Sequence, residues 1–387
     1  MSGALGQGPL FLFCLVFLLG AVVVVHELGH YLAGRMFGAA AESFSVGFGR
    51  SIFERTDKRN TRWRINWIPL GGFVKFVGES QMPGDVGKIE RGPLGKRFMD
   101  LTVGERSIVA VAGPLANFLL AIALFAVIAL VHGKPLEHVT IGAVNPGPAA
   151  DAGLQVGDVI VAIDGEQMNH SADIRRVISL STGDKLDLTV LRGGLEKTFE
   201  VTPVRTPIDN GLGQKQPVGA INVGLSVERY GRQTFNPATA LAEGVRDTGE
   251  AVATTGKMIA RMVTGREPLS QLSGPVGIGD LTRRAVNSTL EVEQIPLGTR
   301  LTLVGWTLLQ ICAYVSVGIG LFNLFPLPVL DGGHLIFNAY EAVTGSVLPA
   351  KVQEVSLTFG LLLLLSVAAV VTWGDIIETG IFQGLGA

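Results

Sequence analysis

The chain is poor in charged residues. Asp, Glu, Lys and Arg make up only 17% of its 387 residues, whereas soluble domains carry about 25%. Lys and Arg are absent from residues 1–34 and from 374–387, and no charged residue precedes Glu27. The net charge of −2 gives no indication of a nucleic-acid partner. The deficit indicates that several segments lie in lipid, so that the bilayer itself is a partner.

Cysteine is scarce as well. Cys14 and Cys312 are the two cysteines, and both lie in apolar runs. Their number and separation suggest neither a disulfide framework nor a cysteine metal site. We interpret both thiols as small groups that fill apolar surroundings.

Long hydrophobic runs take the place of charge. A helix needs about 20 mostly apolar residues to cross a bilayer. Four segments meet this length: Pro9–Ala33, Ile108–Val131, Leu301–Phe325 and Val355–Trp373. The first has no basic residue before its apolar run, unlike a signal peptide, so we expect it to remain as a membrane helix. The expected fold class is a membrane α-helical protein with four transmembrane helices.

The positions of Lys and Arg predict the orientation of these spans. Residues 35–106 carry 13 of them, and short positive loops stay in the cytoplasm. The long insert 132–300 carries 17, but long loops cross the membrane regardless of charge. We therefore expect both termini and the insert to be extracytoplasmic.

The first part of the insert, residues 140–203, is predicted to be rich in β-strands. Apolar and polar residues alternate over 158–163 and 185–191. Two dipeptides typical of hairpin turns accompany these runs, Asp164-Gly165 and Gly193-Gly194. A short helix over Ser171–Ser179 fits between the strands.

Residues Asn236–Arg266 change to helical spacing. Apolar residues recur there at intervals of three, four and seven, namely Leu241, Val245, Val252, Ile259 and Met262. Such a helix lies either on the outer membrane surface or within the soluble region, and the sequence leaves both open.

The strongest chemical pattern is His26-Glu27-Leu28-Gly29-His30. Residues four apart share one face of a helix, so both imidazoles can bind one zinc ion while Glu27 acts as general base. A carboxylate inside a spanning helix costs about 2.5 kcal/mol or more, which indicates a functional residue. A Glu–His pair that only joins helices leaves the second histidine unexplained. Arg35 follows His30 by about 7–8 Å of helix, which places the site near the cytoplasmic face.

A catalytic zinc site needs a third protein ligand and an open position. Asp331 is the best candidate, because the third span returns to the membrane level of His30 just before it. Pro326 and Pro328 end that helix and let the chain turn the carboxylate towards the metal. His334 is the rival ligand.

The run Pro146–Asp158, continued by Val159–Gly165, resembles PDZ domains. These domains capture extended peptides by adding a strand to a sheet edge. We assign a PDZ domain to residues 138–204, where a peptide or the end of a trimmed substrate would bind. The alternative is a β-domain that only spaces or braces the spans.

Five motifs in order resemble the bacterial site-2 proteases, the RseP-like intramembrane zinc metalloproteases, over nearly the whole chain. They are His26–His30 (the zinc motif), Pro69–Lys75 (a membrane-dipping β-segment), Ala112–Phe118 (in the second span), Ser273–Ile278, and Asn323–Gly333 (the third-ligand motif). Some members carry two PDZ domains, whereas one is found here, which leaves the gating of substrates open.

The resemblance implies a metalloendopeptidase in which His26, His30 and Asp331 hold Zn²⁺. Glu27 would take a proton from water and pass it to the leaving amine. Asn323 would bind substrate or stabilise the oxyanion, with helix packing as its alternative role.

A transmembrane substrate must unwind before it is cut. The unwound segment could pair with a strand expected over Arg64–Lys75, which makes Gly71, Gly72 and Phe73 candidate substrate-binding residues. Alternatively, this hairpin only seals the site.

By the resemblance, the substrates are single-span proteins of the bacterial cytoplasmic (inner) membrane that were trimmed on their outer side. Membrane-bound anti-sigma factors of the envelope stress response are the leading case, and signal-peptide remnants are another. The PDZ domain would exclude untrimmed proteins. Two rival functions are an inactive PDZ-bearing scaffold, which the complete set of candidate ligands opposes, and a metal transporter, which the lack of paired halves opposes.

The expected organisation follows from these assignments. Its segments are 1–34 (first span), 35–106 (cytoplasmic, membrane-associated β-hairpin), 107–132 (second span), 138–204 (PDZ domain), 205–300 (amphipathic and linker region), 301–333 (third span with the Asp-Gly motif) and 334–387 (cytoplasmic-side loop and fourth span).

Overall fold

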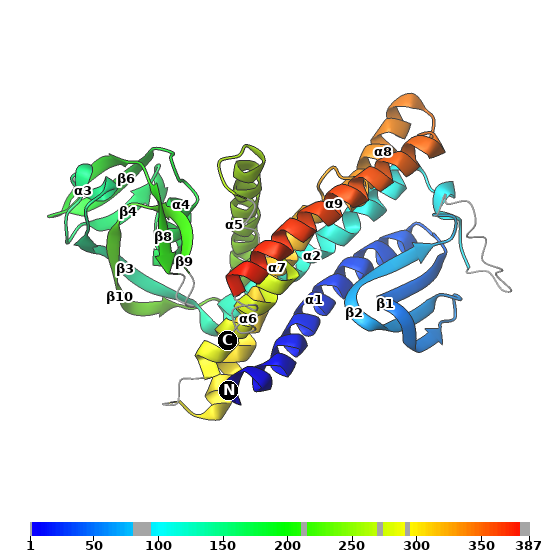
Figure 1. The fold of residues 1–387 in the computed structure, drawn as a ribbon, viewed down its shortest axis with the longest axis horizontal. Coiled ribbons are helices and arrows are strands. Elements are labelled where there is room, and N and C mark those ends of the chain that lie inside the picture. Colours follow the sequence, from blue (N-terminus) through cyan, green and yellow to red (C-terminus); the bar gives the residue numbers. More distant parts are fainter. Residues whose placement is uncertain (1, 80–93, 210–214, 269–273, 291–294, 380–387) are drawn as a thin grey trace. The chain divides into compact units, whose positions relative to one another are not determined.

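The computed structural model describes residues 2–79, 94–209, 215–268, 274–290 and 295–379 (Figure 1). Ser273 of the fourth expected motif and parts of the expected segments 35–106, 205–300 and 334–387 lie outside these residues. The chain divides into two compact units. The helical unit comprises residues 1–126, 243–256 and 264–387, and the β unit comprises 127–242 and 257–263.

Apolar sequence builds the helices of the helical unit. They are α1 (Ser2–Met36), α2 (Val103–His132), α6 (Pro275–Leu290), α7 (Leu297–Asn323), α8 (Asp331–Thr344) and α9 (Ala350–Thr379), with a short 3₁₀ helix at Phe98–Asp100. Within the described residues, α2, α7 and α9 are long and apolar enough to cross a membrane. Helices α2 and α9 contain the second and fourth expected spans, and α7 contains the third except for its last two residues, Leu324 and Phe325. The first expected span falls in α1, many of whose early side chains lie outside the description.

Helices α1 and α2 approach each other closely because small residues line their contact. A Cβ at Gly29 would overlap the carbonyl oxygen of Ala112 and come within 2.8 Å of the Cβ of Ala116. Helix α6 packs against α1, α7 and α9. Cys312 of α7 is buried with Leu18 and Val22 of α1, as expected for a thiol in apolar surroundings.

A compact sheet follows α1. Strands β1 (Ala41–Thr56) and β2 (Arg62–Phe76) are antiparallel, but this is more than a simple hairpin. The first half of β1 pairs with both halves of β2: Phe44, for example, is opposite both Val74 and Trp63. The second half of β1 pairs only with the first half of β2. The segment 72–76 is therefore an edge of the sheet.

A tight turn separates α7 from α8. The chain leaves helical geometry after Asn323 and re-enters it at Asp331, as Pro326 and Pro328 predict. Residues 334–344, expected to form a loop, instead continue α8. Sequence reasoning missed this helix because Gly332 and Gly333 discourage one, whereas here they are required by close packing. A Cβ on either would overlap the backbone carbonyls of the turn.

The β unit contains a six-stranded sheet in the order β10-β3-β4-β6-β7, with β5 paired to β4. The strands are β3 (Lys134–Val144), β4 (Val159–Ile163), β5 (Glu166–Gln167), β6 (Leu186–Arg192), β7 (Leu195–Val201) and β10 (Val223–Gln233); β8 (Val204–Asp209) and β9 (Lys215–Ala220) form a separate hairpin. Helices α3 (Pro148–Asp151) and α4 (Ser171–Ser179) complete this part. Helix α5 (Pro237–Val263) was predicted over 236–266; its residues 243–256 are assigned to the helical unit and the rest to the β unit.

Local predictions in the β unit are confirmed. Helix α4 has the expected bounds, and both expected turns have the positive φ angles that their glycines favour, 52° and 77° at Asp164-Gly165 and 60° and 83° at Gly193-Gly194. The sheet does not end at residue 204, however. Strand β10, which lies in the expected linker region, pairs with β3 along its length.

Candidate metal centre

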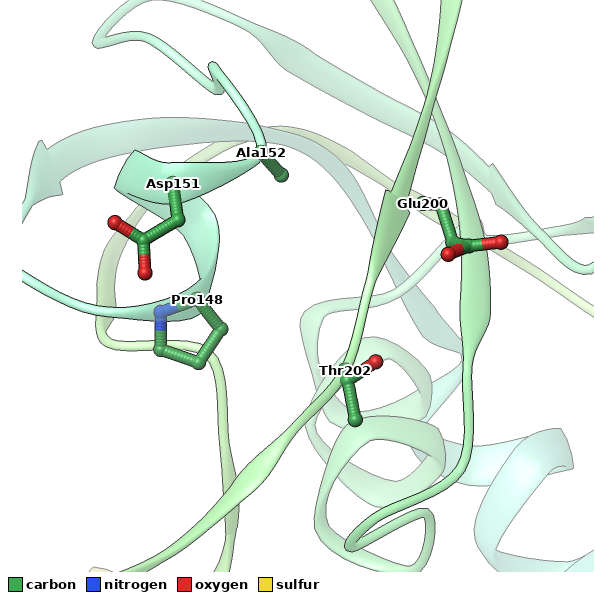
Figure 2. Close-up of a pocket in the computed structure, with 5 residues that line it drawn as sticks. All are labelled: Pro148, Asp151, Ala152, Glu200 and Thr202. Atoms are coloured by element: carbon green, nitrogen blue, oxygen red, sulfur yellow. The ribbon is translucent and has the colours of Figure 1, made fainter.

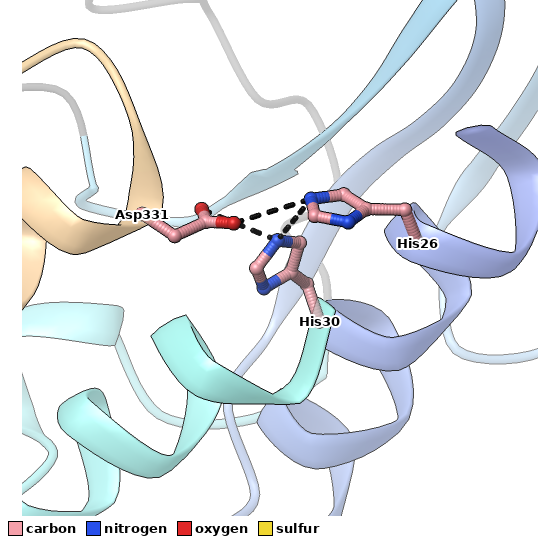
Figure 3. Close-up of side chains that lie close together, drawn as sticks. All are labelled: His26, His30 and Asp331. Atoms are coloured by element: carbon pink, nitrogen blue, oxygen red, sulfur yellow. Dashed lines mark hydrogen bonds and ion pairs between the residues drawn. The ribbon is translucent and has the colours of Figure 1, made fainter. Parts of the chain in front are cut away.

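Three side chains from distant parts of the sequence meet in the helical unit. One ligand atom each from His26, His30 and Asp331 lies within 4.8 Å of the others. Figure 3 shows both imidazoles reaching from α1 towards the carboxylate at the start of α8. The Nε2 atoms are 3.1 Å apart, and Asp331 oxygens lie 3.2 Å from His26 Nε2 and 3.4 Å from His30 Nε2. These are the three residues predicted as zinc ligands.

Residues of helix α2 contact both imidazole rings. Gly113 lies directly against His30, and a Cβ there would overlap the ring. Four residues later, the Asn117 side-chain amide lies 3.2 Å from His26 Nδ1. The two helices run antiparallel, so the spacing of His26 and His30 matches the spacing of Asn117 and Gly113. This explains the motif Ala112–Phe118 in physical terms.

A backbone group determines which nitrogen of His30 faces the cluster. His30 Nδ1 lies 2.8 Å from the carbonyl oxygen of Val109, and a carbonyl can only accept. Nδ1 therefore carries the hydrogen, and in the neutral ring Nε2 presents its lone pair to the cluster. Metal-binding histidines are commonly oriented by such an outer hydrogen bond.

Asp331 is positioned by the turn before it. Leu330 is the N-cap and Asp331 the first residue of α8, where the helix dipole favours negative charge. The carboxylate is mostly buried, and its Oδ2 has no hydrogen-bond partner in the described part of the chain. The short distance to His26 Nε2 thus reflects proximity without hydrogen-bond geometry. His334, the rival ligand, is not in the cluster.

Glu27 connects this centre to the sheet. Its carboxylate accepts a hydrogen bond of 3.0 Å from the backbone N–H of Val74. Val74 lies on the edge segment 72–76, and its N–H faces away from β1 because it donates to Glu27. The candidate base therefore touches the free edge of the sheet.

The predicted substrate-binding residues lie on or beside this edge. Gly72 packs close to α1: a Cβ there would lie 3.4 Å from the Cγ of Glu27 and 2.9 Å from the carbonyl oxygen of Ser45. Gly71 adopts a φ of 92°, and Phe73 is partly exposed. Asn323, at the end of α7, donates its side-chain amide to the carbonyl of Ile319 in the same helix; the cluster of ligand atoms in the described residues consists of His26, His30 and Asp331.

Sequence reasoning missed two charged residues near the metal centre. Arg106, at the start of α2, forms a buried 2.6 Å ion pair with Glu341 of α8, so this pair joins the helix that contacts the histidines to the helix that carries Asp331. Glu79 follows β2, and burial raises its pKa to about 7 against the lowering effect of a hydrogen bond from Phe76 N–H.

The donor set fits zinc. Two imidazole nitrogens that face each other at 3.1 Å cannot both carry hydrogen, and the buried Asp331 Oδ2 lacks a donor. A cation shared by the three residues satisfies all of these atoms. Two histidines and one carboxylate are a common ligand set of catalytic zinc, with a further position left for water or substrate.

The described pocket of the β unit has no part in this centre. It has a volume of about 360 Å³ and is lined by Pro148, Asp151, Ala152, Glu200 and Thr202 (Figure 2). None of these is a predicted site residue. Its two carboxylates, Asp151 and Glu200, are not part of the metal cluster found among the described residues.

Comparison with known proteins shows the family. The sequence model of peptidase family M50 matches residues 14–367 of this chain. The chain belongs to peptidase family M50. As an M50 peptidase, it is a zinc-dependent metalloprotease.

Sequence alignments with relatives extend over almost the whole of this M50 peptidase. A protein of Brucella suis is 37% identical over 369 residues, which are 93% of each chain, and one of Agrobacterium fabrum is 37% identical over 93% of this chain and 94% of its own. Both are named as candidate zinc metalloproteases. The metalloprotease MmpA of Caulobacter vibrioides is 35% identical over 388 residues, 96% of each chain.

Proposed function

We propose that this metalloprotease hydrolyses peptide bonds within the transmembrane segments of single-span proteins. The observation that carries the proposal is the position of the cluster. His26 and His30 lie on the long apolar helix α1, and α1 packs against α7, one of the helices long enough to cross a bilayer. A protease whose centre is built from such helices is suited to substrates that are themselves in lipid.

The proposed roles follow from the contacts. His26, His30 and Asp331 hold the zinc ion. When bound, the ion supplies Lewis acidity, which activates water near neutral pH and polarises a carbonyl group. Glu27 takes the proton from water and delivers it to the leaving amine. Asn323 retains a second amide N–H beyond the one given to Ile319, and this donor stabilises substrate or oxyanion.

The substrate binds as an added strand. The edge segment 72–76 pairs with β1 on one side only. On its other side the N–H groups of Val74 and Phe76 donate to the carboxylates of Glu27 and Glu79, and an added substrate strand would take the place of these carboxylates. An unwound substrate paired with this edge lies beside the base. Gly71, Gly72 and Phe73 are the residues along which it runs.

The proposed topology has four spans, with α1 as the first. Residues 35–106 are cytoplasmic, and both termini are outside, in accordance with the positions of Lys and Arg. We place the protein in the bacterial cytoplasmic (inner) membrane.

The β unit is proposed to be an extracytoplasmic PDZ domain. Its edge strand β10 is available for strand addition by a peptide. The domain either binds the new end of a trimmed substrate or excludes substrates that still carry a bulky outer domain. Anti-sigma factors trimmed on their outer side are the proposed substrate class, with signal-peptide remnants as a second class.

Two experiments with purified protein in detergent or vesicles test the proposal. The wild type, incubated with tagged single-span proteins, cuts them within the membrane segment, and a zinc chelator stops the reaction. The Glu27→Gln variant retains one zinc per chain and cuts nothing. The proposal is wrong if the wild type leaves all single-span substrates intact while it degrades an unfolded soluble protein. An inactive scaffold, the alternative, would bind peptide but cut neither class.

A further inference from the structure

We propose that Asn117 is a positioning residue whose side-chain amide, beside His26 Nδ1, holds the His26 ring with its Nε2 atom towards the metal cluster. The inference rests on the proposed ligand set. It concerns a residue that lies beside Nδ1 of His26, whereas the Nε2 atom of the same ring faces the cluster.

Each histidine turns one ring nitrogen towards the cluster and the other towards α2. The two Nε2 atoms face each other at 3.1 Å, whereas His30 Nδ1 lies 2.8 Å from the carbonyl oxygen of Val109. His26 Nδ1 lies 3.2 Å from the side-chain amide of Asn117. The outer nitrogen of each ring therefore contacts a group of α2.

A cation held by both Nε2 atoms requires a lone pair on His26 Nε2, so in the neutral ring the hydrogen is on Nδ1. Nδ1 then needs an acceptor, and the Nδ2 group of Asn117 cannot accept. The Oδ1 of the same amide can, and the two orientations of an amide have the same heavy-atom shape.

The surroundings of Asn117 permit either orientation of its amide. The residue is fully buried, and its Oδ1 has no hydrogen-bond partner in the described part of the chain. The amide is thus held in neither orientation by a further contact. The backbone is fixed, because Ser316 donates to the Asn117 carbonyl at 2.8 Å and Gly320 packs against its Cβ. An asparagine amide offers His26 Nδ1 a hydrogen-bond acceptor, whereas an aliphatic side chain offers none.

The test measures zinc affinity by competition with a chelator, and thermal unfolding in excess chelator, on the full-length protein. Asn117→Leu keeps the volume and removes both polar atoms. We expect it to lower zinc affinity by about 10–100-fold, with little change of unfolding temperature in chelator. Asn117→Asp supplies an acceptor only and should restore affinity to within about threefold of the wild type. Ser316→Ala, which removes a contact to the same residue without touching the imidazole, serves as control and should bind zinc normally.

The outcomes separate this inference from the ligand assignment. If His26→Ala binds zinc like the wild type, the ligand set itself is wrong. If His26→Ala loses zinc but Asn117→Leu binds it as tightly as the wild type, only the role of Asn117 is refuted. Equal losses in Asn117→Leu and Ser316→Ala would likewise refute it, since they would reflect packing alone.

Discussion

The imidazole of His30 occupies the space that a side chain at Gly113 would need. This relationship joins a residue of α1 to a residue of α2 that lies 83 positions later. It makes the glycine a requirement of the metal centre and not merely of helix packing.

Gly113→Ala should therefore weaken zinc binding. The added methyl group pushes the ring away from the cluster, and we expect at least a tenfold loss of affinity, measured by chelator competition. Gly104→Ala is the matched control in the same helix, because a Cβ there meets nothing within 4 Å. It should leave affinity unchanged and gain up to about 1 kcal/mol of stability from helix propensity. Normal zinc binding by Gly113→Ala would show that the helices separate easily.

Proline at Val74 tests strand addition. Proline at Val74 removes an outward-facing donor, which is also the N–H that Glu27 accepts, so slower cleavage fits either role and unchanged cleavage is the decisive outcome. The N–H groups of its neighbours face β1 by the alternation of an antiparallel pair. Val74→Pro should slow cleavage at least tenfold with zinc content intact. Val74→Ala keeps the N–H and should cut at near the wild-type rate. Proline at Phe73 would also break pairing to β1, so it is the less specific variant. Unchanged cleavage by Val74→Pro would remove the edge-strand model of substrate binding.

The stability of the β unit should depend on pH through Asp158. Arg192 donates two hydrogen bonds of 2.6 Å to this buried carboxylate, which hold the pKa of Asp158 below its ordinary value of 3.8. A lowered pKa in the folded state means that the contribution is complete above the unfolded pKa, near 4, and is lost as pH falls through the folded value. Asp158→Asn should cost about 2 kcal/mol at pH 7.

Hydrogen exchange of β4 and β6 in the intact chain provides the measurement. The difference between Asp158→Asn and the wild type should shrink as the pH falls below about 4. A constant difference from pH 7 to pH 2 would show that the carboxylate charge is unimportant.

The β unit, which is the proposed size filter, can be excised at two positions that lie opposite each other. Lys134 and Gln233 are directly opposite in the β3–β10 pair, so excision of residues 134–233 brings neighbouring chain ends together. A short Gly-Ser linker from Gly133 to Thr234 should preserve the helical unit. Cleavage of untrimmed substrate should appear, and cleavage of trimmed substrate should stay the same. If only trimmed substrate is cut, the β unit is not a size filter. Excision of 140–204 alone would remove most of β3 and leave β10 without its partner.

Short-range patterns explain what the sequence could predict. The turns at Asp164-Gly165 and Gly193-Gly194 and the helix Ser171–Ser179 depend on neighbouring residues, and their conformations match. The spacing of His26 and His30 is likewise local to one helix. Asp331 joined them because span lengths and basic residues together predicted its depth.

Long-range relationships explain the rest. Strand β10 pairs with β3 across sequence separations of 79 to 99 residues, and neither segment carries a local pattern that identifies its partner. Arg106 and Glu341 are separated by 235 positions. The contact of Asn117 with His26 was hidden for the same reason, although a polar residue in an apolar helix is a signal of function that could have singled it out.

The three α2 positions beneath the histidines, Val109, Gly113 and Asn117, recur every fourth residue and form a single stripe. Rotation of α2 about its axis by one residue, about 100°, would move all three residues away from the histidines, so that both rings would lose their contacts with α2 at the same time. Zinc occupancy and the rotational setting of α2 are therefore thermodynamically linked. A change that rotates this helix lowers the affinity for zinc, and bound zinc opposes the rotation by the same coupling free energy.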